Sequence, residues 1–325
     1  MITAIKANPI TAIFIVSLIV VIGSLIAGIS GYAMTTDTTQ AANTTSPAPP
    51  PPPIIIAPQK IVVPGQHFRL PPATIYVPDY YHAKKNIVNL LIHFHGASWM
   101  VEQNFYATGK NAVVVTVSLG GLSGVYTAKY QDKKEFGRLL NQVLETLDKN
   151  SIVHHPKLGR LSLASFSAGF GAMREILQVP EYYKKINDVV FLDSIHAGLD
   201  TTTNEPPAEQ MQMFLKFAKD AVQGKKTMWI THSQIDPITY ASTTKTANYL
   251  INTLGIKQRF ADDTTAPTNI DATEPWKYMK LISTADKGKL HVRGFYGDQA
   301  QDHMNHLYTM GEYISQTSLP SIIDK

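Results

Sequence analysis

The sequence predicts an α/β fold in which helices cover both faces of a mostly parallel β-sheet. After Lys60, short runs of apolar and β-branched residues alternate with amphipathic helical stretches, a pattern typical of parallel sheets. The chain has 325 residues, of which 44% are hydrophobic, and this suffices to bury a large core. It contains no cysteine, which excludes a disulfide-stapled scaffold and any cysteine-based metal site.

An uncharged segment near the N-terminus predicts a membrane anchor within residues 1–34. Apolar side chains dominate residues 10–29, and about 20 such residues span the hydrocarbon core of a bilayer. Lys6 precedes this segment and the next basic residue is Lys60, so we expect a single-pass protein with a cytoplasmic N-terminus. A signal peptide cleaved near Ala33 is the alternative and would give a secreted protein. Both interpretations place the rest of the chain outside the cytoplasm.

Residues 35–58 predict an extended linker that leads to one folded domain at residues 59–325. The linker is rich in Thr, Ala and Asn, and its proline run at residues 49–53 favours a polyproline II spacer. Residues 1–59 hold one basic and one acidic residue, Lys6 and Asp37, so the net charge of +4 belongs to the domain. That balance is too mild to indicate a nucleic-acid-binding surface.

Within the domain, buried strands alternate with amphipathic helices. Strands are expected at residues 87–94, 112–117, 161–164, 189–193, 227–231 and 290–295, with an early edge strand at residues 75–77. Helices are expected at residues 132–149, 169–178, 208–222, 242–254 and 306–316. Residues 257–288 have no firm pattern, and we expect them to form an insertion before the last strand.

A serine lies in a tight turn between a strand and a helix. The segment Ser165-Phe-Ser167-Ala-Gly169 is a G-x-S-x-G motif in which serine replaces the first glycine. Small residues at both ends of the motif let the strand and the helix approach closely around a strained central residue. The turn therefore predicts that Ser167 projects from the sheet as a nucleophile, with the Ala168 N–H directed into the same space.

A second strand ends in His95-Gly96-Ala97, where glycine lets the backbone turn sharply. Backbone N–H groups in such a turn can stabilise a developing oxyanion. We expect Gly96 and Ala97, together with Ala168, to form the oxyanion hole.

Two aspartates follow neighbouring strands. Asp236 lies beyond the strand at residues 227–231, and Asp193 ends the strand before it. A serine hydroxyl is a poor nucleophile unless a histidine takes its proton and a carboxylate orients that histidine. Asp236 is the expected acid and Asp193 the alternative.

Two histidines follow the last strand and compete for the role of the base. His303 is expected on the loop before the last helix and His306 inside that helix, so His303 is the expected base and His306 the alternative. The spacing His-x-x-His also suits a metal, but the helical zinc signature includes a glutamate that is absent here. We therefore expect no metal and no cofactor.

These motifs resemble those of the α/β-hydrolase superfamily. The resemblance rests on the His95-Gly96 turn, the motif around Ser167 and the chain order Ser167, Asp236, His303. It implies an eight-stranded, mostly parallel sheet and an acyl-enzyme formed on Ser167. The acid more commonly follows the later strand in this superfamily, which favours Asp236 over Asp193.

The resemblance and the N-terminal segment together predict a membrane-tethered, extracytoplasmic serine hydrolase that cleaves carboxylic esters. Its substrate would be a small-molecule or polymeric ester. The protein is expected to associate with a membrane through its N-terminal helix and to bind no nucleic acid. A serine peptidase of the same fold and a non-catalytic binding module are the alternatives. The motifs do not identify the substrate, because the fold and the triad define a reaction class only.

Overall fold

The computed structural model describes residues 54–268 and 270–322. The chain divides into two units, residues 1–55 and residues 56–325, and the second contains nearly all of the described residues. The predicted membrane segment, and the linker up to residue 53, lie outside the described residues. Within the part of the chain that the structure describes, no helix has the length and apolar character needed to cross a bilayer.

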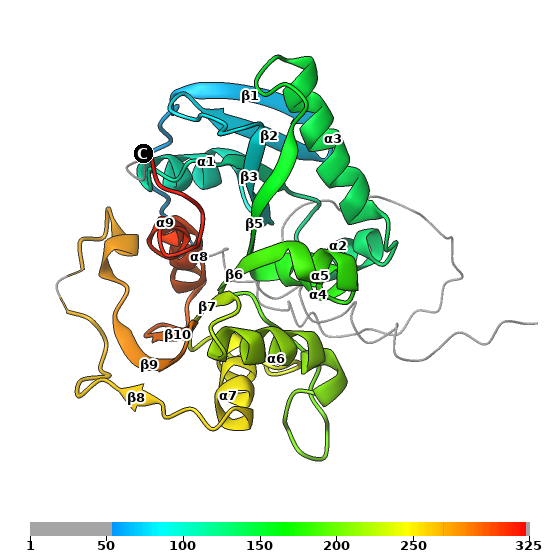
Figure 1. The fold of residues 1–325 in the computed structure, drawn as a ribbon. Helices are drawn as coiled ribbons and strands as arrows, with labels where there is room; N and C mark the ends of the chain where they lie inside the picture. Colours follow the sequence, from blue (N-terminus) through cyan, green and yellow to red (C-terminus); the bar gives the residue numbers. More distant parts are fainter. Residues whose placement is uncertain (1–53, 269, 323–325) are drawn as a thin grey trace, which may run out of the picture. The chain divides into compact units, whose positions relative to one another are not determined.

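A ten-stranded sheet forms the centre of the domain, in the order β1-β2-β4-β3-β5-β6-β7-β10-β9-β8 (Figure 1). The six central strands, in the sheet order β4, β3, β5, β6, β7 and β10, run parallel to one another. The outer strands pair antiparallel: β1 and β2 on one side, and β9 and β8 on the other. The strands are β1 (Gly65–Leu70), β2 (Ala73–Pro78), β3 (Ile87–Phe94), β4 (Val113–Val117), β5 (Lys157–Phe166), β6 (Ile186–Leu192), β7 (Thr227–His232), β8 (Arg259–Phe260), β9 (Leu281–Lys287) and β10 (Leu290–Phe295).

The mostly parallel α/β sheet confirms the predicted fold class, and the sheet differs from the expectation at both of its edges. The expected number of eight strands is wrong because β8 and β9 extend the sheet beyond β10. The strand predicted at residues 75–77 is not an edge strand, since β1 pairs with its outer side. Most residues of β1 are exposed and β9 is only partly buried, so both strands lack the continuous apolar runs by which buried strands are recognised.

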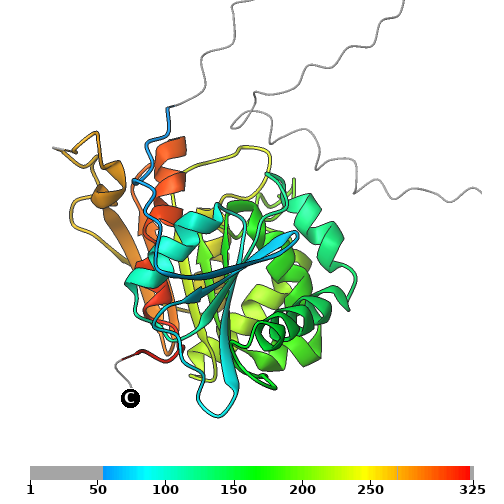
Figure 2. The same ribbon diagram turned by 90° about the horizontal axis from the view of Figure 1, so that it is seen from above.

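Helices cover both faces of the sheet (Figures 1 and 2). The helices are α1 (Ser98–Ala107), α2 (Ser123–Tyr130), α3 (Glu135–Lys149), α4 (Phe170–Leu177), α5 (Pro180–Lys185), α6 (Ala208–Val222), α7 (Thr243–Thr253), α8 (Ala300–Tyr308) and α9 (Met310–Ile314), with short 3₁₀ turns η3 (Ser167–Gly169) and η4 (Pro275–Tyr278). One apolar core lies between the sheet and α2, α3, α4, α6 and α7; the other lies beneath α1, α8 and α9.

The central strands are buried on both faces. In β3, Leu90 and Ile92 pack into the first core and Leu91 packs into the second, because successive side chains of a strand point to opposite faces. This double burial explains why the parallel strands have continuous apolar sequences.

The C-terminal helix begins earlier than predicted. The sequence places His303 on a loop before a helix at residues 306–316, but His303 lies in the first turn of α8. Gln299 caps this helix, and its side chain and that of Asp302 form reciprocal hydrogen bonds with backbone N–H groups. The predicted loop position is therefore wrong, because the sequence analysis missed this capping box.

Candidate active site

Three parallel strands end in residues with a left-handed backbone at the same edge of the sheet. The φ angle is 74° at His95 after β3, 46° at Ser167 after β5 and 43° at Asp193 after β6. Phe166 and Leu192 are register partners, so Ser167 and Asp193 each lie one residue beyond the same rung of the sheet. A left-handed conformation is costly for these residue types and concentrates at functional sites.

The turn at Ser167 depends on the absence of a side chain at Gly169. A Cβ atom at this position would lie 2.2 Å from the carbonyl oxygen of Phe94, which is closer than real Cβ contacts. Gly169 therefore lets the start of α4 approach β3 closely. Ser167 is partly exposed and both of its neighbours in sequence are buried, so the turn presents this side chain at the surface of the sheet edge.

Serine has a structural role at the first position of the motif. The hydroxyl of Ser165 lies 2.7 Å from that of Ser194, and Ser194 donates a hydrogen bond of 2.9 Å to the carbonyl of Ser167. Both hydroxyl groups are fully buried. This pair supports the strained turn in a way that a glycine at residue 165 could not.

His303 and Asp193 form a buried hydrogen-bonded pair. Nδ1 of His303 donates to Oδ2 of Asp193 at 2.7 Å, and the Asp193 side chain is 2% exposed. The His303 imidazole also packs against Phe166, with 4.5 Å between the ring centroids. In neutral His303 the proton is thus on Nδ1, which leaves Nε2 free to accept a proton.

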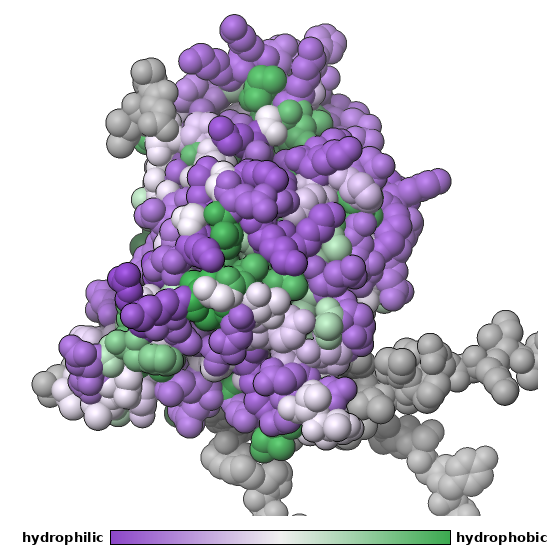
Figure 3. Space-filling model, turned by 60° about the horizontal axis from the view of Figure 1, so that its bottom comes forward, coloured by the Kyte–Doolittle hydropathy of each residue, from purple (hydrophilic) through white to green (hydrophobic). Residues whose placement is uncertain are grey.

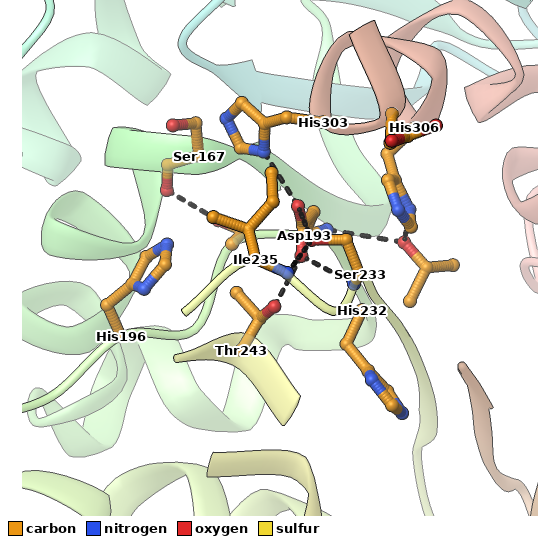
Figure 4. A network of polar contacts seen from close by, with 12 residues as sticks. Ser167, Asp193, His196, His232, Ser233, Ile235, Thr243, His303 and His306 are labelled. Carbon is orange, nitrogen blue, oxygen red and sulfur yellow. Dashed lines mark hydrogen bonds and ion pairs between the residues drawn. The ribbon is translucent and has the colours of Figure 1, made fainter. Parts of the chain in front are cut away.

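Figure 4 shows Ser167 on the side of the His303 imidazole opposite to Asp193, next to the free ring nitrogen. In this structure no hydrogen bond joins the Ser167 hydroxyl to His303. Catalytic hydrogen bonds often tighten only when substrate binds.

The carboxylate of Asp193 is held by several further donors (Figure 4). Ser233 donates through its backbone N–H at 2.9 Å and through its hydroxyl at 2.8 Å, and the Thr243 hydroxyl donates to the same carboxylate. Burial raises the pKa of Asp193, but positive charge on His306 and His303 and the hydrogen bonds from His303 and Thr243 outweigh it. The net pKa lies well below the usual range, so this carboxylate stays ionised.

The structure does not bring Asp236 to His303. Asp236 is exposed, and its Oδ1 accepts a hydrogen bond of 3.1 Å from the backbone N–H of Ile238, within its own turn. The expected pairing of His303 with Asp236 is therefore replaced by its pairing with Asp193, the alternative acid. The physical reason is that Asp236 lies four residues beyond the end of β7, whereas Asp193 directly follows β6.

His306 faces away from the serine and is 1% exposed. Its Nδ1 lies 2.7 Å from the Thr231 hydroxyl, which in turn accepts a hydrogen bond of 3.2 Å from the backbone N–H of Asp193. Burial lowers the pKa of His306 to about 4. This geometry makes His306 a buried neighbour of Asp193 and leaves His303 as the one of the two candidate bases that faces Ser167.

The turn after β3 presents backbone donors. Gly96 and Ala97 make no backbone N–H hydrogen bond among the described residues. Nε2 of the buried His93 donates to the carbonyl of His95 at 2.7 Å, and Nδ1 of His95 lies 3.0 Å from the Tyr126 hydroxyl. These two contacts fix the turn, so both N–H groups are available as the predicted oxyanion donors. Gly96 itself has a φ angle of 132°, which side-chain-bearing residues rarely adopt.

Aromatic side chains line the other side of Ser167. His196 lies below Ser167 in Figure 4, with ring-centroid distances of 5.6 Å to Phe170 and 5.2 Å to Tyr240. Its Nδ1 lies 3.3 Å from the carbonyl of Ala241, and burial lowers its pKa to about 4. At neutral pH His196 is therefore an uncharged side chain that lines the site.

One cavity of the described domain lies away from the candidate catalytic residues. It has a volume of about 520 Å³ and lies between Trp276, Tyr308 and Glu312, and none of the candidate catalytic residues lines it. The surface in Figure 3 is mostly hydrophilic, with hydrophobic residues gathered near the middle of the face. Exposed large hydrophobic residues include Leu122 and Val125, at the start of α2, and Ile238, on the loop after β7.

The sequence analysis missed Ser194, Ser233 and Thr243, which hold the serine turn and the acid. Ser194 directly follows Asp193, and Ser233 directly follows β7, so their positions beyond strand ends were a usable signal. Thr243 begins α7, and only the folded chain brings it to Asp193.

The strand order, the left-handed turn at Ser167 and the Ser–His–Asp arrangement are consistent with the α/β-hydrolase fold.

No protein family model and no curated protein matches the sequence. Among solved structures, an uncharacterised protein from Capnocytophaga ochracea is 9% identical, over 74% of this chain and 59% of its own, with a TM-score of 0.42. A thermostable esterase is 10% identical, over 76% and 59% of the two chains, with a TM-score of 0.42.

An arylesterase is 11% identical, over 80% of this chain and 86% of its own, with a TM-score of 0.39. The chain spans 59% of the length of the first two of these proteins. Similarities at this level do not assign an activity to this chain.

Proposed function

We propose that the domain is a serine hydrolase that cleaves carboxylic esters through an acyl-enzyme on Ser167. The single observation that carries this proposal is the 2.7 Å hydrogen bond from His303 Nδ1 to the ionised Asp193, with Ser167 at the opposite edge of the imidazole. A positioned serine, base and buried acid are the groups that acyl transfer requires.

The acylation step follows from this geometry. Ser167 Oγ attacks the carbonyl carbon of the ester while its proton moves to His303 Nε2. The tetrahedral oxyanion accepts hydrogen bonds from the N–H groups of Ala168 and of Gly96 or Ala97. When the intermediate collapses, the C–O bond to the alcohol breaks and His303 returns the proton to the leaving oxygen.

Deacylation repeats these steps with water. His303 removes a proton from water, the hydroxide attacks the acyl carbon, and the Ser167 oxygen leaves with the proton. Asp193 stabilises the imidazolium that forms in both halves of the cycle, and its low pKa keeps it a carboxylate throughout.

A fluorophosphonate probe tests the nucleophile, because it reacts covalently with activated serines. We expect the wild-type protein to be labelled and Ser167→Ala to remain unlabelled. Ser315→Ala, which removes a half-buried serine whose hydroxyl bonds only the neighbouring Glu312 and Gln316, is the matched control and should be labelled like the wild type. Labelling of Ser167→Ala at the wild-type rate would refute the assignment.

Comparison of substrates then distinguishes an esterase from a peptidase. We expect hydrolysis of a p-nitrophenyl ester to exceed that of the matching p-nitroanilide by at least a hundredfold in kcat/KM. Equal rates would identify a peptidase of the same fold instead. No turnover of either, without probe labelling, would identify a non-catalytic binding module.

We further propose that residues 10–29 tether the enzyme to a membrane with the domain outside the cytoplasm. The support is the uncharged apolar segment and the position of Lys6 before it. The full-length protein should remain in the membrane fraction after a high-salt wash. Recovery of a soluble form that begins near Met34 would show cleavage and secretion instead.

A further inference from the structure

Residues 56–63, called the strap below, cross the two helices that flank the candidate site before the chain enters β1. In Figure 2 the strap is the blue segment that passes beside α8 and over α1. Val63 is buried in the core beneath these helices, whereas Ile61 and Val62 are exposed. Hydrogen bonds from side-chain amides, as well as apolar packing, therefore hold the strap to the helices.

The side-chain amide of Gln301, in α8, forms two hydrogen bonds with the backbone of Ile56. Gln301 Oε1 accepts a hydrogen bond of 2.7 Å from the Ile56 N–H, and Gln301 Nε2 donates one of 3.0 Å to the Ile56 carbonyl. The second amide proton of Gln301 is donated to Asn305 Oδ1 at 2.8 Å. Asn305 is 4% exposed and donates in turn to the carbonyl of Pro275.

This contact lies behind the catalytic base. Gln301 and His303 are two residues apart in the first turn of α8, so their side chains leave the helix on nearly opposite faces. His303 faces Asp193, while Gln301 faces the strap. The capping box at Gln299 and Asp302 satisfies backbone N–H groups at the start of α8, and the Gln301 contact adds a tether between this part of the helix and the strap.

The other end of the strap binds α1 in a similar way. Gln103 Oε1 accepts a hydrogen bond of 3.0 Å from the Ile61 N–H, and Gln103 Nε2 donates one of 3.3 Å to the carbonyl of Gln59. Helix α1 starts directly after Gly96 and Ala97, the candidate oxyanion donors. The strap thus joins the helix that carries the base to the helix that follows the oxyanion turn.

We propose that the strap positions His303 for proton transfer, and that Gln301 is the positioning residue that connects the strap to α8. This inference rests on the proposed function. Ile56, the first residue of the strap, makes its contact with the helix that carries the candidate base. A displacement of about 1 Å at a catalytic group can lower a rate about a hundredfold, so a modest loosening of α8 is measurable.

The first experiment replaces Gln301 in the full-length chain. Gln301→Met keeps the length of the side chain and removes every amide contact, and we expect a tenfold lower kcat on a p-nitrophenyl ester with KM within twofold of the wild type. Gln301→Glu keeps an acceptor for the Ile56 N–H and should recover part of this loss. Tm is measured for each variant so that a loss of folded protein is recognised.

Asn111 offers a matched control, since it forms the same amide clamp elsewhere. Its Oδ1 accepts from the His82 N–H at 3.0 Å, and its Nδ2 donates to the His82 carbonyl at 2.9 Å. Asn111→Leu removes this clamp without touching α8, so kcat should stay within twofold of the wild type. An equal loss of kcat in Asn111→Leu and Gln301→Met would overturn the proposal.

A double-mutant cycle tests whether Gln301 acts through the strap. Ile56→Pro removes the N–H that Gln301 accepts and leaves the residue 56 carbonyl in place, and we expect it to lower kcat about threefold in the wild-type background. In the Gln301→Met background the same substitution should have no further effect, because the contact is already lost. Additive losses would show that Gln301 does not act through Ile56 and would overturn the proposal.

The rate of fluorophosphonate labelling at Ser167 separates this inference from the proposed function. If the wild type is labelled and Gln301→Met is labelled severalfold more slowly, the inference is supported. If both are labelled at the same rate, the inference fails and the proposed function stands. If Ser167→Ala is labelled like the wild type, the proposed function fails, and with it the basis for the strap's role.

Discussion

His303 Nδ1 lies 2.7 Å from Asp193 Oδ2, although 110 residues separate the two in sequence. Asp193 reaches this position because its φ angle of 43° turns the chain sharply at the end of β6. Ser233 and Thr243 complete the hydrogen bonding of the carboxylate from two other elements. The Asp193 carboxylate is thus enclosed by three segments of the chain, while the His303 side chain remains 22% exposed.

Replacing the acid should reduce turnover. We expect Asp193→Asn to lower kcat on a p-nitrophenyl ester by about 10³- to 10⁴-fold, because an amide cannot stabilise the imidazolium and favours the wrong tautomer. Asp236→Asn is the matched control and should stay within twofold of the wild type, since this carboxylate bonds only its own turn. A loss in Asp236→Asn that equals or exceeds the loss in Asp193→Asn would reverse the assignment.

A hydroxyl that bonds the Asp193 carboxylate should contribute more to kcat than a nearby hydroxyl that does not bond it. Thr243→Val keeps the shape of the side chain and removes one hydrogen bond to the carboxylate, so we expect about tenfold lower kcat. Thr246 is a buried threonine one turn further along α7, and its hydroxyl bonds the backbone carbonyl groups of Ile195 and Thr243 and not the Asp193 carboxylate. Steady-state kinetics of Thr246→Val should show less than a threefold change, and equal losses would argue against a specific role for Thr243.

The buried histidines predict that the domain loses stability in mild acid. The pKa of His306 is lowered from 6.5 to about 4, so the unfolded chain binds the proton more readily than the native domain between these values. Stability therefore rises with pH across this window and falls as the pH drops from about 6.5 towards 4. At pH 5 the loss amounts to about 2 kcal/mol from His306 relative to pH 7.

Urea unfolding at pH 7 and pH 5 measures this effect. His306→Gln keeps a polar group opposite Thr231 and should reduce the pH-dependent loss by about 2 kcal/mol. His154 has a side chain that is 75% exposed, and His154→Gln serves as the control for the loss of a histidine. The same pH dependence in the wild type and in His306→Gln would refute the burial argument.

The serine turn should not accept a side chain at residue 169. A Cβ atom on Gly169 would overlap the carbonyl oxygen of Phe94, so we expect Gly169→Ala to destabilise the domain by about 2–4 kcal/mol and to abolish activity. Nothing lies within 4 Å of a Cβ atom at Gly121, which has no positive φ angle. Denaturant titrations of Gly121→Ala should therefore match the wild type, and a similar result for Gly169→Ala would show that the turn can relax.

The sequence determined the elements whose signal is local. Strands β3 and β10 and helix α6 have the predicted bounds, because continuous apolar runs and helical periodicity depend only on neighbouring residues. The turn at Ser167 could also be predicted, since small residues between a strand and a helix mark it directly. Strand β9 could not, because its side chains are half exposed and it is held by pairing with β10.

Only the tertiary structure decided which carboxylate meets the histidine. Asp193 and Asp236 both follow parallel strands, so both satisfy the rule that reactive groups gather at the carboxyl ends of such strands. The outcome depends on backbone geometry and distance: a left-handed turn directs Asp193 towards α8, whereas Asp236 lies farther along a loop and bonds its own backbone. The hydrogen bonds between the Gln301 amide and Ile56 could not be predicted from the sequence either. Residues that lie 245 positions apart leave no local pattern of their contact.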